Sequence, residues 1–339
     1  MRCLRYGVVR FGQMLFTGSS AIWQQPVRLR RMQIKILGSA AGGGFPQWNC
    51  ACSNCSAVRA GTFAGQRRTQ AQVIVSGEDE SWFLLGASPD LRSQIEATPE
   101  LHPKAGVRIS PISGVVLTSS DLDHVLGLLL LRELQPLHVF ATASVLQILQ
   151  EDNSFFGMLN RVPRQVEWSS IVPGAPFELT SVDGCRSGIV GTALTLATRY
   201  PAYVTPKRAG QLRSTEAVTG LILESSGRRL AYLSSVGSID EKLMEALNNV
   251  DVLLFDGTFW SDDELMQVQS SGATAQQMGH VPVGGSAGSL RRLAKLRHGK
   301  KIFIHINNTN PMLNESSPEH RAVREAGWEI AEDGWQFTL

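Results

Sequence analysis

The sequence has few cysteines, no long apolar run and no excess of charge of either sign. Its 339 residues include five cysteines, too few for a disulfide-stabilised scaffold. No run reaches the roughly 18 apolar residues of a transmembrane helix, so we expect no membrane insertion. The 32 basic and 30 acidic residues leave a net charge of +2, which gives no electrostatic reason to expect a nucleic-acid partner.

Acidic residues are absent from residues 1–31, whereas six arginines lie there. A basic, acid-poor segment is typical of a transit peptide. The other interpretation is a misassigned start, because Met32 directly precedes the alternating pattern of a first strand at residues 33–37. We predict that residues 1–31 are a disordered extension or are not translated, and that residues 32–339 form one domain.

Short apolar runs alternate with helical patterns over that domain. Neither a Pro/Ser-rich linker nor an internal repeat divides it, which favours a single α/β domain with helices covering the sheets. Segments 151–190 and 201–218 are the least regular, and the second is a candidate mobile loop over a site. The expected strands are 34–37, 71–75, 82–85, 114–117, 138–141, 193–198, 219–224, 229–233, 252–255 and 301–305. The expected helices are 89–97, 125–134, 143–150, 240–248, 274–278, 286–295 and 318–326.

Three of the five cysteines form the pattern C-x-C-x-x-C at Cys50, Cys52 and Cys55. Three thiolates this close in sequence can converge on one tetrahedral ion, most often zinc. The other interpretation is a group of buried free cysteines. The crowding favours a metal clip in a reducing compartment. We therefore predict a structural zinc, with a fourth ligand from elsewhere in the fold, and a cytoplasmic location.

Residue types that bind metals follow several strand-like runs. The stretch VVLTSSDLDHVLGL places Asp121, Asp123 and His124 between an apolar strand and an apolar helix. Three later motifs have an acid or a histidine in a similar place: Asp256 in LLFDGTFW, His280 in MGHVPVGG and His305 in KIFIHINNTNP. Strand ends gather into one site in layered α/β folds. The alternatives are helix capping by Asp121 or Asp123 and a purely structural role for each histidine.

These motifs resemble those of the metallo-β-lactamase superfamily, whose signature is a strand followed by T-H-x-H-x-D-H. Together with GSAAGGGFPQWNC and the cysteine pattern, the set is similar to the coenzyme PQQ synthesis protein B family over residues 33–339. The resemblance implies an αββα sandwich of two mixed β-sheets flanked by helices, with the site at one edge.

The chain departs from the superfamily signature at its first two histidine positions, which fall on Ser119 and Asp121. In dinuclear members those histidines help to hold the metal that helps to activate the hydrolytic water, so the resemblance implies that this metal is absent. The other ligand set is retained as Asp123, His124 and His305. Two histidines and one carboxylate around one ion, with open positions, suit non-haem Fe(II) and O2 chemistry. Zinc in the same triad is the alternative.

If Asp123, His124 and His305 bind the metal, four further residues have expected roles around it. Asp256 is expected to be a further ligand or to orient one. His280 is the candidate for general acid–base catalysis or substrate contact. Asp121 is expected to bind the metal, to orient His124 or to cap the helix. Asn308 is a candidate fourth ligand or outer partner.

Two cations in the irregular segment 201–218 are candidates for contacts to substrate carboxylates. These are Lys207 and Arg208. The alternative is that both lie in a solvated loop.

The resemblance implies a metal- and O2-dependent hydroxylase in the biosynthesis of pyrroloquinoline quinone (PQQ). Its substrate would be a small molecule with a cross-linked Glu–Tyr core, whose tyrosine-derived ring is hydroxylated. Fe(II) is expected at the catalytic site and zinc at the cysteines, and a homodimer is left open. Two other functions remain: a carrier of PQQ or its precursor toward the periplasm, and a metal-dependent hydrolase, which Ser119 disfavours.

Overall fold

The computed structural model describes residues 31–78, 81–104, 106–269, 272–296 and 299–339. We predict that residues 1–31 are disordered or not translated. Apart from Arg31, these residues lie outside the described ranges. No helix within the described ranges is both long and apolar enough to cross a membrane.

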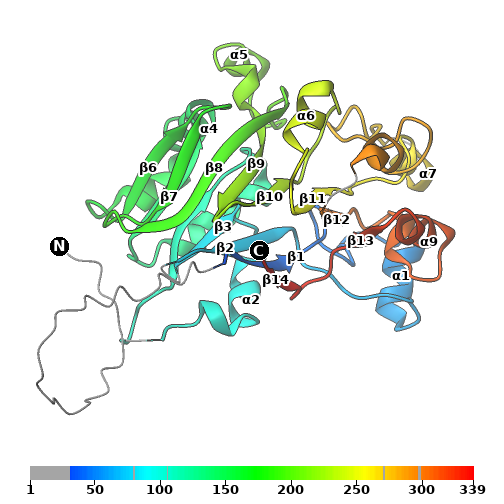
Figure 1. Cartoon of the computed structure of the whole chain (residues 1–339), viewed down its shortest axis with the longest axis horizontal. Coiled ribbons are helices and arrows are strands. Elements are labelled where there is room, and N and C mark those ends of the chain that lie inside the picture. The colour runs from blue at the N-terminus through cyan, green and yellow to red at the C-terminus, as the bar shows by residue number, and fades with distance from the viewer. Residues whose placement is uncertain (1–30, 79–80, 105, 270–271, 297–298) are drawn as a thin grey trace, which may run out of the picture.

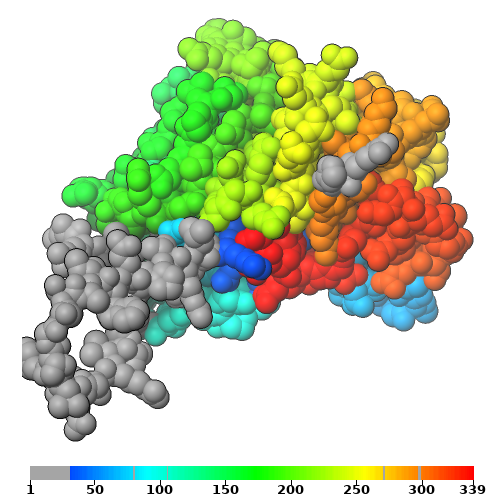
Figure 2. All heavy atoms as spheres, viewed as in Figure 1, coloured from blue at the N-terminus to red at the C-terminus, as the bar shows by residue number. Residues whose placement is uncertain are grey.

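Two seven-stranded mixed sheets form the centre of the described chain (Figure 1). In spatial order, the strands of the first sheet are β14 (Gln336–Thr338), β1 (Gln33–Gly38), β2 (Gln72–Ser76), β3 (Trp82–Leu85), β4 (Ile112–Val116), β5 (Leu137–Thr142) and β6 (Val166–Ile171). Those of the second are β13 (Trp328–Ile330), β12 (Lys300–Ile304), β11 (Val252–Asp256), β10 (Arg228–Leu233), β9 (Val218–Ser225), β8 (Arg186–Ala197) and β7 (Pro176–Thr180). The last strand, β14, pairs with β1, and the red C-terminal residues lie beside the blue ones in Figure 2.

Each sheet combines a parallel half with an antiparallel half. Strands β3 to β6 run parallel in the first sheet, and β10 to β13 run parallel in the second. The remaining neighbours are antiparallel. The parallel strands β10, β11 and β12 therefore end at one edge of their sheet, which is where sites form in such folds.

Three buried apolar clusters define four layers. One lies between the sheets and includes Phe83, Tyr232 and Leu254. The others lie on the outer faces, where α2 (Leu91–Glu96) and α4 (Ala143–Gln150) cover the first sheet, and α1 (Ser53–Ala60), α6 (Glu241–Ala246) and α9 (Pro318–Glu325) cover the second. The short helices are α3 (Leu122–Val125), α5 (Pro206–Ala209), α7 (Glu264–Val268) and α8 (Ser289–Arg292). The expected αββα sandwich is confirmed.

Segment 151–190, expected to be among the least regular, contains β6, β7 and the start of β8. β6 and β7 each lie at the end of their sheet, and most of their residues are half-buried or exposed. An edge strand with this burial lacks the apolar run of a central strand, so its sequence did not reveal it.

Two expected helices are wrong. In place of a helix over 125–134, α3 ends at Val125 and a 3₁₀ helix follows at Leu126–Leu131. Gly127 donates its N–H to the Ala87 carbonyl, and a Cβ on it would lie 2.3 Å from the Ser88 carbonyl oxygen, so packing against this neighbouring loop overrides helix propensity. In place of a helix over 274–278, residues 275–279 form turns, and the last of them, Gly279, has a φ of +89°.

Candidate metal centre

The predicted motifs meet at the edge where β10, β11 and β12 end. Asp256 is the last residue of β11, and His305 follows β12 directly, with a left-handed φ of +58°. The end of β4 reaches the same edge from the other sheet, because the Thr219 N–H donates to the Thr118 carbonyl at 2.7 Å. The structure thus brings Asp123 and His124 opposite His305, although 182 residues separate Asp123 from His305 in sequence.

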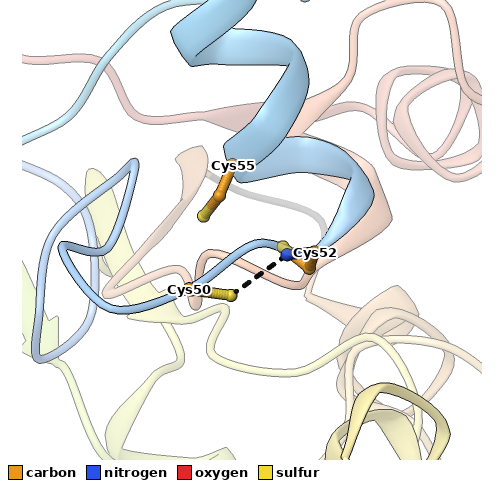
Figure 3. A group of neighbouring side chains, drawn as sticks. All are labelled: Cys50, Cys52 and Cys55. Carbon is orange, nitrogen blue, oxygen red and sulfur yellow. Dashed lines mark hydrogen bonds between the residues drawn. The ribbon is translucent and has the colours of Figure 1, made fainter.

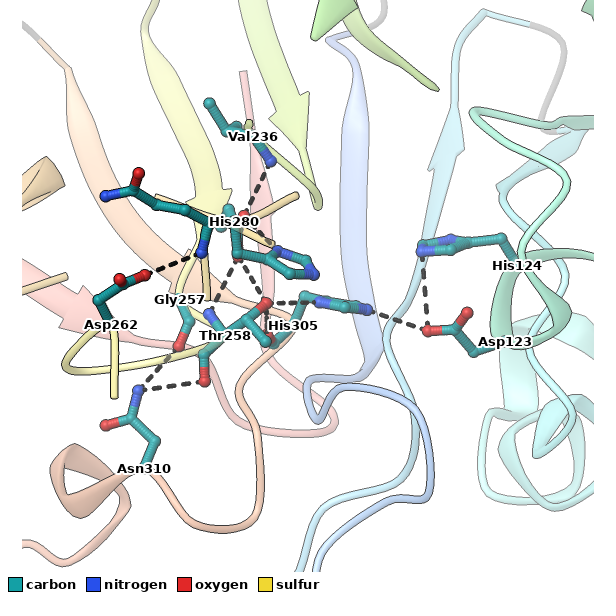
Figure 4. Close-up of polar contacts among 11 residues, drawn as sticks. Asp123, His124, Val236, Gly257, Thr258, Asp262, His280, His305 and Asn310 are labelled. Atoms are coloured by element: carbon teal, nitrogen blue, oxygen red, sulfur yellow. Dashed lines mark hydrogen bonds and ion pairs between the residues drawn. The ribbon is translucent and has the colours of Figure 1, made fainter. Parts of the chain in front are cut away.

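Asp123, His124 and His305 form a compact triad of potential ligands (Figure 4). Their nearest ligand atoms all lie within 4.8 Å of one another. Asp123 Oδ2 lies 3.0 Å from His305 Nε2 and 3.9 Å from His124 Nε2. Two imidazoles and a carboxylate converging in this way match the donor set of a single transition-metal ion with open positions.

The charge state of the triad follows from competition between burial and neighbouring charge. Burial opposes ionisation of Asp123, yet His124 and the hydrogen bond from His305 outweigh it and hold the pKa of this carboxyl well below its ordinary value. Burial lowers the pKa of His124. Burial acts in the same direction on His305, but the hydrogen bond to Asp123 prevails and raises its pKa. The group therefore offers an ionised carboxylate to a cation.

Thr258, which sequence reasoning missed, determines how His305 is presented. Its Oγ1 lies 2.6 Å from Asp256 Oδ1 and 2.9 Å from His305 Nδ1. A hydroxyl that donates to Asp256 accepts from the Nδ1–H of His305, which turns Nε2 toward Asp123. Nε2 donates to Asp123 here, and a bound ion would take the place of that proton. The available signal was the threonine two residues after Asp256 in FDGTF.

Asp256, His280 and His305 also bring their ligand atoms within 4.8 Å of one another, but the Asp256 carboxylate is already occupied. Its Oδ1 accepts the N–H and O–H of Thr258, and its Oδ2 accepts the Val236 N–H at 2.8 Å and lies 2.7 Å from His280 Nδ1. Four hydrogen bonds use the acceptor capacity of a carboxylate. Of its two expected roles, the geometry favours orienting the histidines over ligation.

His280 lies beside the triad. Its ring stacks on that of His305 with the centroids 5.6 Å apart, and its side chain is buried. Because Asp256 holds Nδ1, the other ring nitrogen is available for proton transfer. The expected role as an acid–base group fits this position.

Asp121 does not cap the following helix. It is the residue before α3, but its side chain accepts no capping hydrogen bond, so the capping alternative is wrong for this residue. Burial, with the nearby charge of Asp123, raises the pKa of the Asp121 carboxyl. Ser119 is buried, and its Oγ accepts the Asp121 N–H at 3.2 Å.

The cysteine cluster forms a second, separate group at the start of α1 (Figure 3). The sulfurs of Cys50, Cys52 and Cys55 lie within 4.8 Å of one another. Asn308 lies here and not in the triad: its Nδ2 is 3.2, 3.7 and 3.3 Å from the three sulfurs, in that order. Burial raises the pKa of the Cys52 thiol to about 11, so three thiolates at neutral pH require a bound cation.

The two candidate cations of segment 201–218 lie on α5. Arg208 Nε is 2.7 Å from Asp152 Oδ2, and its guanidinium also approaches Glu151 at 3.5 Å. Arg208 is therefore engaged by the end of α4, whereas Lys207 is exposed. The structure does not bring either of them into the triad.

Comparison with known proteins agrees with this fold and site. A family model described as a β-lactamase superfamily domain matches residues 81–306, and the chain belongs to that superfamily. Coenzyme PQQ synthesis protein B of Methylobacterium sp. (strain 4-46) is 42% identical over 91% of this chain and its own full length. The protein of that name from Xanthomonas oryzae pv. oryzae (strain MAFF 311018) is 40% identical over the same shares. The chain is a member of the coenzyme PQQ synthesis protein B family.

Solved structures support the same placement. The crystal structure of Zn²⁺-bound PqqB from Methylobacterium extorquens is similar with a TM-score of 0.83 and 39% identity, over 91% of this chain and all of that one. A diphosphatase from the PhnP family has a TM-score of 0.62 at 21% identity, over 91% of this chain and 98% of its own, and shares the fold alone.

Proposed function

We propose that this protein is a metal-dependent enzyme of PQQ biosynthesis that hydroxylates the tyrosine-derived ring of a cross-linked Glu–Tyr intermediate. The names of its relatives support the pathway. The observation that carries the chemistry is the single triad of Asp123, His124 and His305, next to Ser119 and Asp121 where the dinuclear signature has two histidines.

The triad fits one ion, and Fe(II) is the metal we assign to it. Fe(II) bound by two histidines and one carboxylate would supply the activation of O2. The balanced reaction places one oxygen atom of O2 in the ring as a hydroxyl and releases the other as water. Two electrons and two protons come from an external two-electron reductant, such as ascorbate in an assay.

The surrounding residues orient ligands and move protons. Thr258 and Asp256 fix the ring nitrogen that His305 presents. His280 Nε2 accepts the phenolic proton of the ring, and Asp256 stabilises the imidazolium through Nδ1. This assignment makes Asp256 a positioning residue and His280 the proton acceptor.

The cysteine cluster is assigned to a structural zinc. Its fourth ligand would be Asn308, because rotation of the amide by 180° exchanges Nδ2 and Oδ1 and turns the oxygen toward the three sulfurs. Asn54 Nδ2 donates to the carbonyls of Asn308 and Asn310, which holds this loop on α1. The zinc would thus anchor the loop that begins at His305.

Uptake of O2 by the Fe(II)-loaded protein, supplied with the cross-linked Glu–Tyr diamino acid and ascorbate, tests the proposal. We expect one O2 consumed per hydroxyl formed and no uptake by His305→Ala. Consumption of the substrate at an undiminished rate without O2 would contradict the proposal, and a hydrolysed product would favour a hydrolase. Tight PQQ binding without uptake or product would instead favour the carrier.

A further inference from the structure

A cavity opens beside the triad and has no role in the chemistry described so far. Three of its lining residues are close in sequence to residues of the site. Asp121 lies two positions before Asp123. Ser235 directly precedes Val236, and Gly279 directly precedes His280. Its volume of about 160 Å³ far exceeds the ~15 Å³ that one water requires, so it has room for part of an organic ligand.

Apolar residues form part of a cavity wall whose exposed lining is otherwise mostly polar. Ala197, Pro201, Val218 and Met278 line it from three segments of the chain. These four residues suit a face of an aromatic ring, because binding removes apolar surface from water on both partners. The apolar part of a ligand therefore fits between these segments.

The charged lining residues are Asp121 and Arg199. Asp121 is half-buried next to the triad, whereas Arg199 is exposed and so belongs to the mouth of the cavity. Arg199 Nη1 donates to the Gln277 carbonyl, which holds the guanidinium against the segment that leads to His280. A guanidinium has five N–H donors, so one such bond leaves a fork for a ligand carboxylate.

We infer that this cavity is the substrate-binding site and that Arg199 binds a carboxylate of the substrate at its mouth. The ring end then points inward to the triad, because Arg199 lies at the exposed mouth and the half-buried Asp121 lies at the end next to the triad. This inference rests on the proposed function and names the substrate as a carboxylated aromatic amino-acid derivative. It also makes Arg199, and not Arg208 or Lys207, the residue that recognises carboxylate.

Binding without turnover tests the inference. The ligands are the cross-linked Glu–Tyr diamino acid and its methyl ester, titrated calorimetrically into the Zn(II)-loaded chain without O2. We expect Arg199→Gln to weaken binding of the acid about tenfold, the usual effect of losing a charged hydrogen bond, and to leave binding of the ester unchanged. Lys207→Gln is the matched control on the neighbouring exposed segment and should bind both ligands like the wild type.

The outcomes distinguish a failure of the role of Arg199 from a failure of the proposed function. If Arg199→Gln binds the acid as tightly as the wild type, or loses acid and ester equally, the role of Arg199 is wrong and the proposed function stands. If the wild type binds neither ligand, the proposed function fails and this inference fails with it.

Discussion

Thr258 is the residue expected to orient His305, the proposed metal ligand that follows β12. Its Oγ1 joins Asp256 to His305 Nδ1 at 2.6 and 2.9 Å. We expect Thr258→Val to lower the affinity of the triad for Co(II) by about tenfold or more, because loss of an outer-shell partner typically costs ~10–100-fold. Competition titration with a chromophoric chelator measures this affinity.

The matched control for this prediction is Thr258→Ser, which keeps the hydroxyl and should keep the affinity. Equal affinities of the valine variant and the wild type would show that Thr258 does not orient His305.

Asn308 gives a second prediction at the residue scale, at the cysteine cluster. Its amide lies 3.2 to 3.7 Å from the three sulfurs. We expect Asn308→Ala to accelerate zinc release to a chelator, since the fourth ligand is lost, while metal binding at the triad persists. Asn314→Ala is a control on the same segment. Unchanged release from the Asn308 variant would exclude Asn308 as the fourth ligand.

At the scale of elements, Glu264 ties the start of α7 to the loop after β12. It accepts hydrogen bonds from the Trp260 N–H and the Thr309 hydroxyl, and burial raises the pKa of its carboxyl from 4.5 to about 7. Between those two values the folded state binds more protons than the unfolded state, so the contribution of Glu264 to stability falls as pH rises. Above pH 7 this loss is complete and no longer changes.

This gives a pH-dependent prediction for Glu264→Gln. A tenfold change in proton affinity corresponds to about 1.4 kcal/mol. The wild type should therefore lose roughly 3 kcal/mol of unfolding free energy relative to the variant as pH rises from 4.5 to 7, in denaturant titrations. Glu241→Gln, at an exposed position, should show no such change. A pH-independent difference between wild type and Glu264→Gln would contradict the assignment.

Central elements could be predicted from the sequence, whereas edge elements could not. β11 was expected at 252–255 and runs over Val252–Asp256, because strands buried on both faces are continuous apolar runs. β6 and β7 carry no such run. The helix expected at 125–134 failed because Gly127 packs against the neighbouring loop, a contact that sequence alone does not reveal.

The same contrast holds for the site. Acids and histidines at strand ends indicated one shared site, and the resemblance to the superfamily signature singled out Asp123, His124 and His305. Thr258 and Arg199 did not stand out, because hydroxyls and arginines are common on surfaces and their partners are distant in sequence. The partner of Thr258 is 47 residues away, and that of Arg199 is 78.

At the scale of the whole molecule, both candidate metals join parts of the chain that are far apart. The cysteines at the start of α1 contact Asn308, which follows them by more than 250 residues in the sequence. A metal that binds only the folded state stabilises it by about 4 kcal/mol at 1,000 times its Kd. We expect zinc removal to lower the Tm of the wild type by several degrees and to leave a Cys50/Cys52/Cys55→Ser variant unaffected.

His124→Ala is the control for that thermal measurement. Because it keeps the cysteine cluster, it should keep the zinc-dependent part of the Tm. Loss of that part in His124→Ala would mean that the stabilising ion lies in the triad.

We propose that the fold holds two independent metal sites, with a single catalytic ion at the triad. Metal quantification after anaerobic purification tests it most directly, on the wild type, His124→Ala and the triple cysteine variant. We predict one iron and one zinc in the wild type, loss of iron alone from His124→Ala and loss of zinc alone from the cysteine variant. Loss of the same ion from both variants, or two ions at the triad, would contradict the two-site proposal.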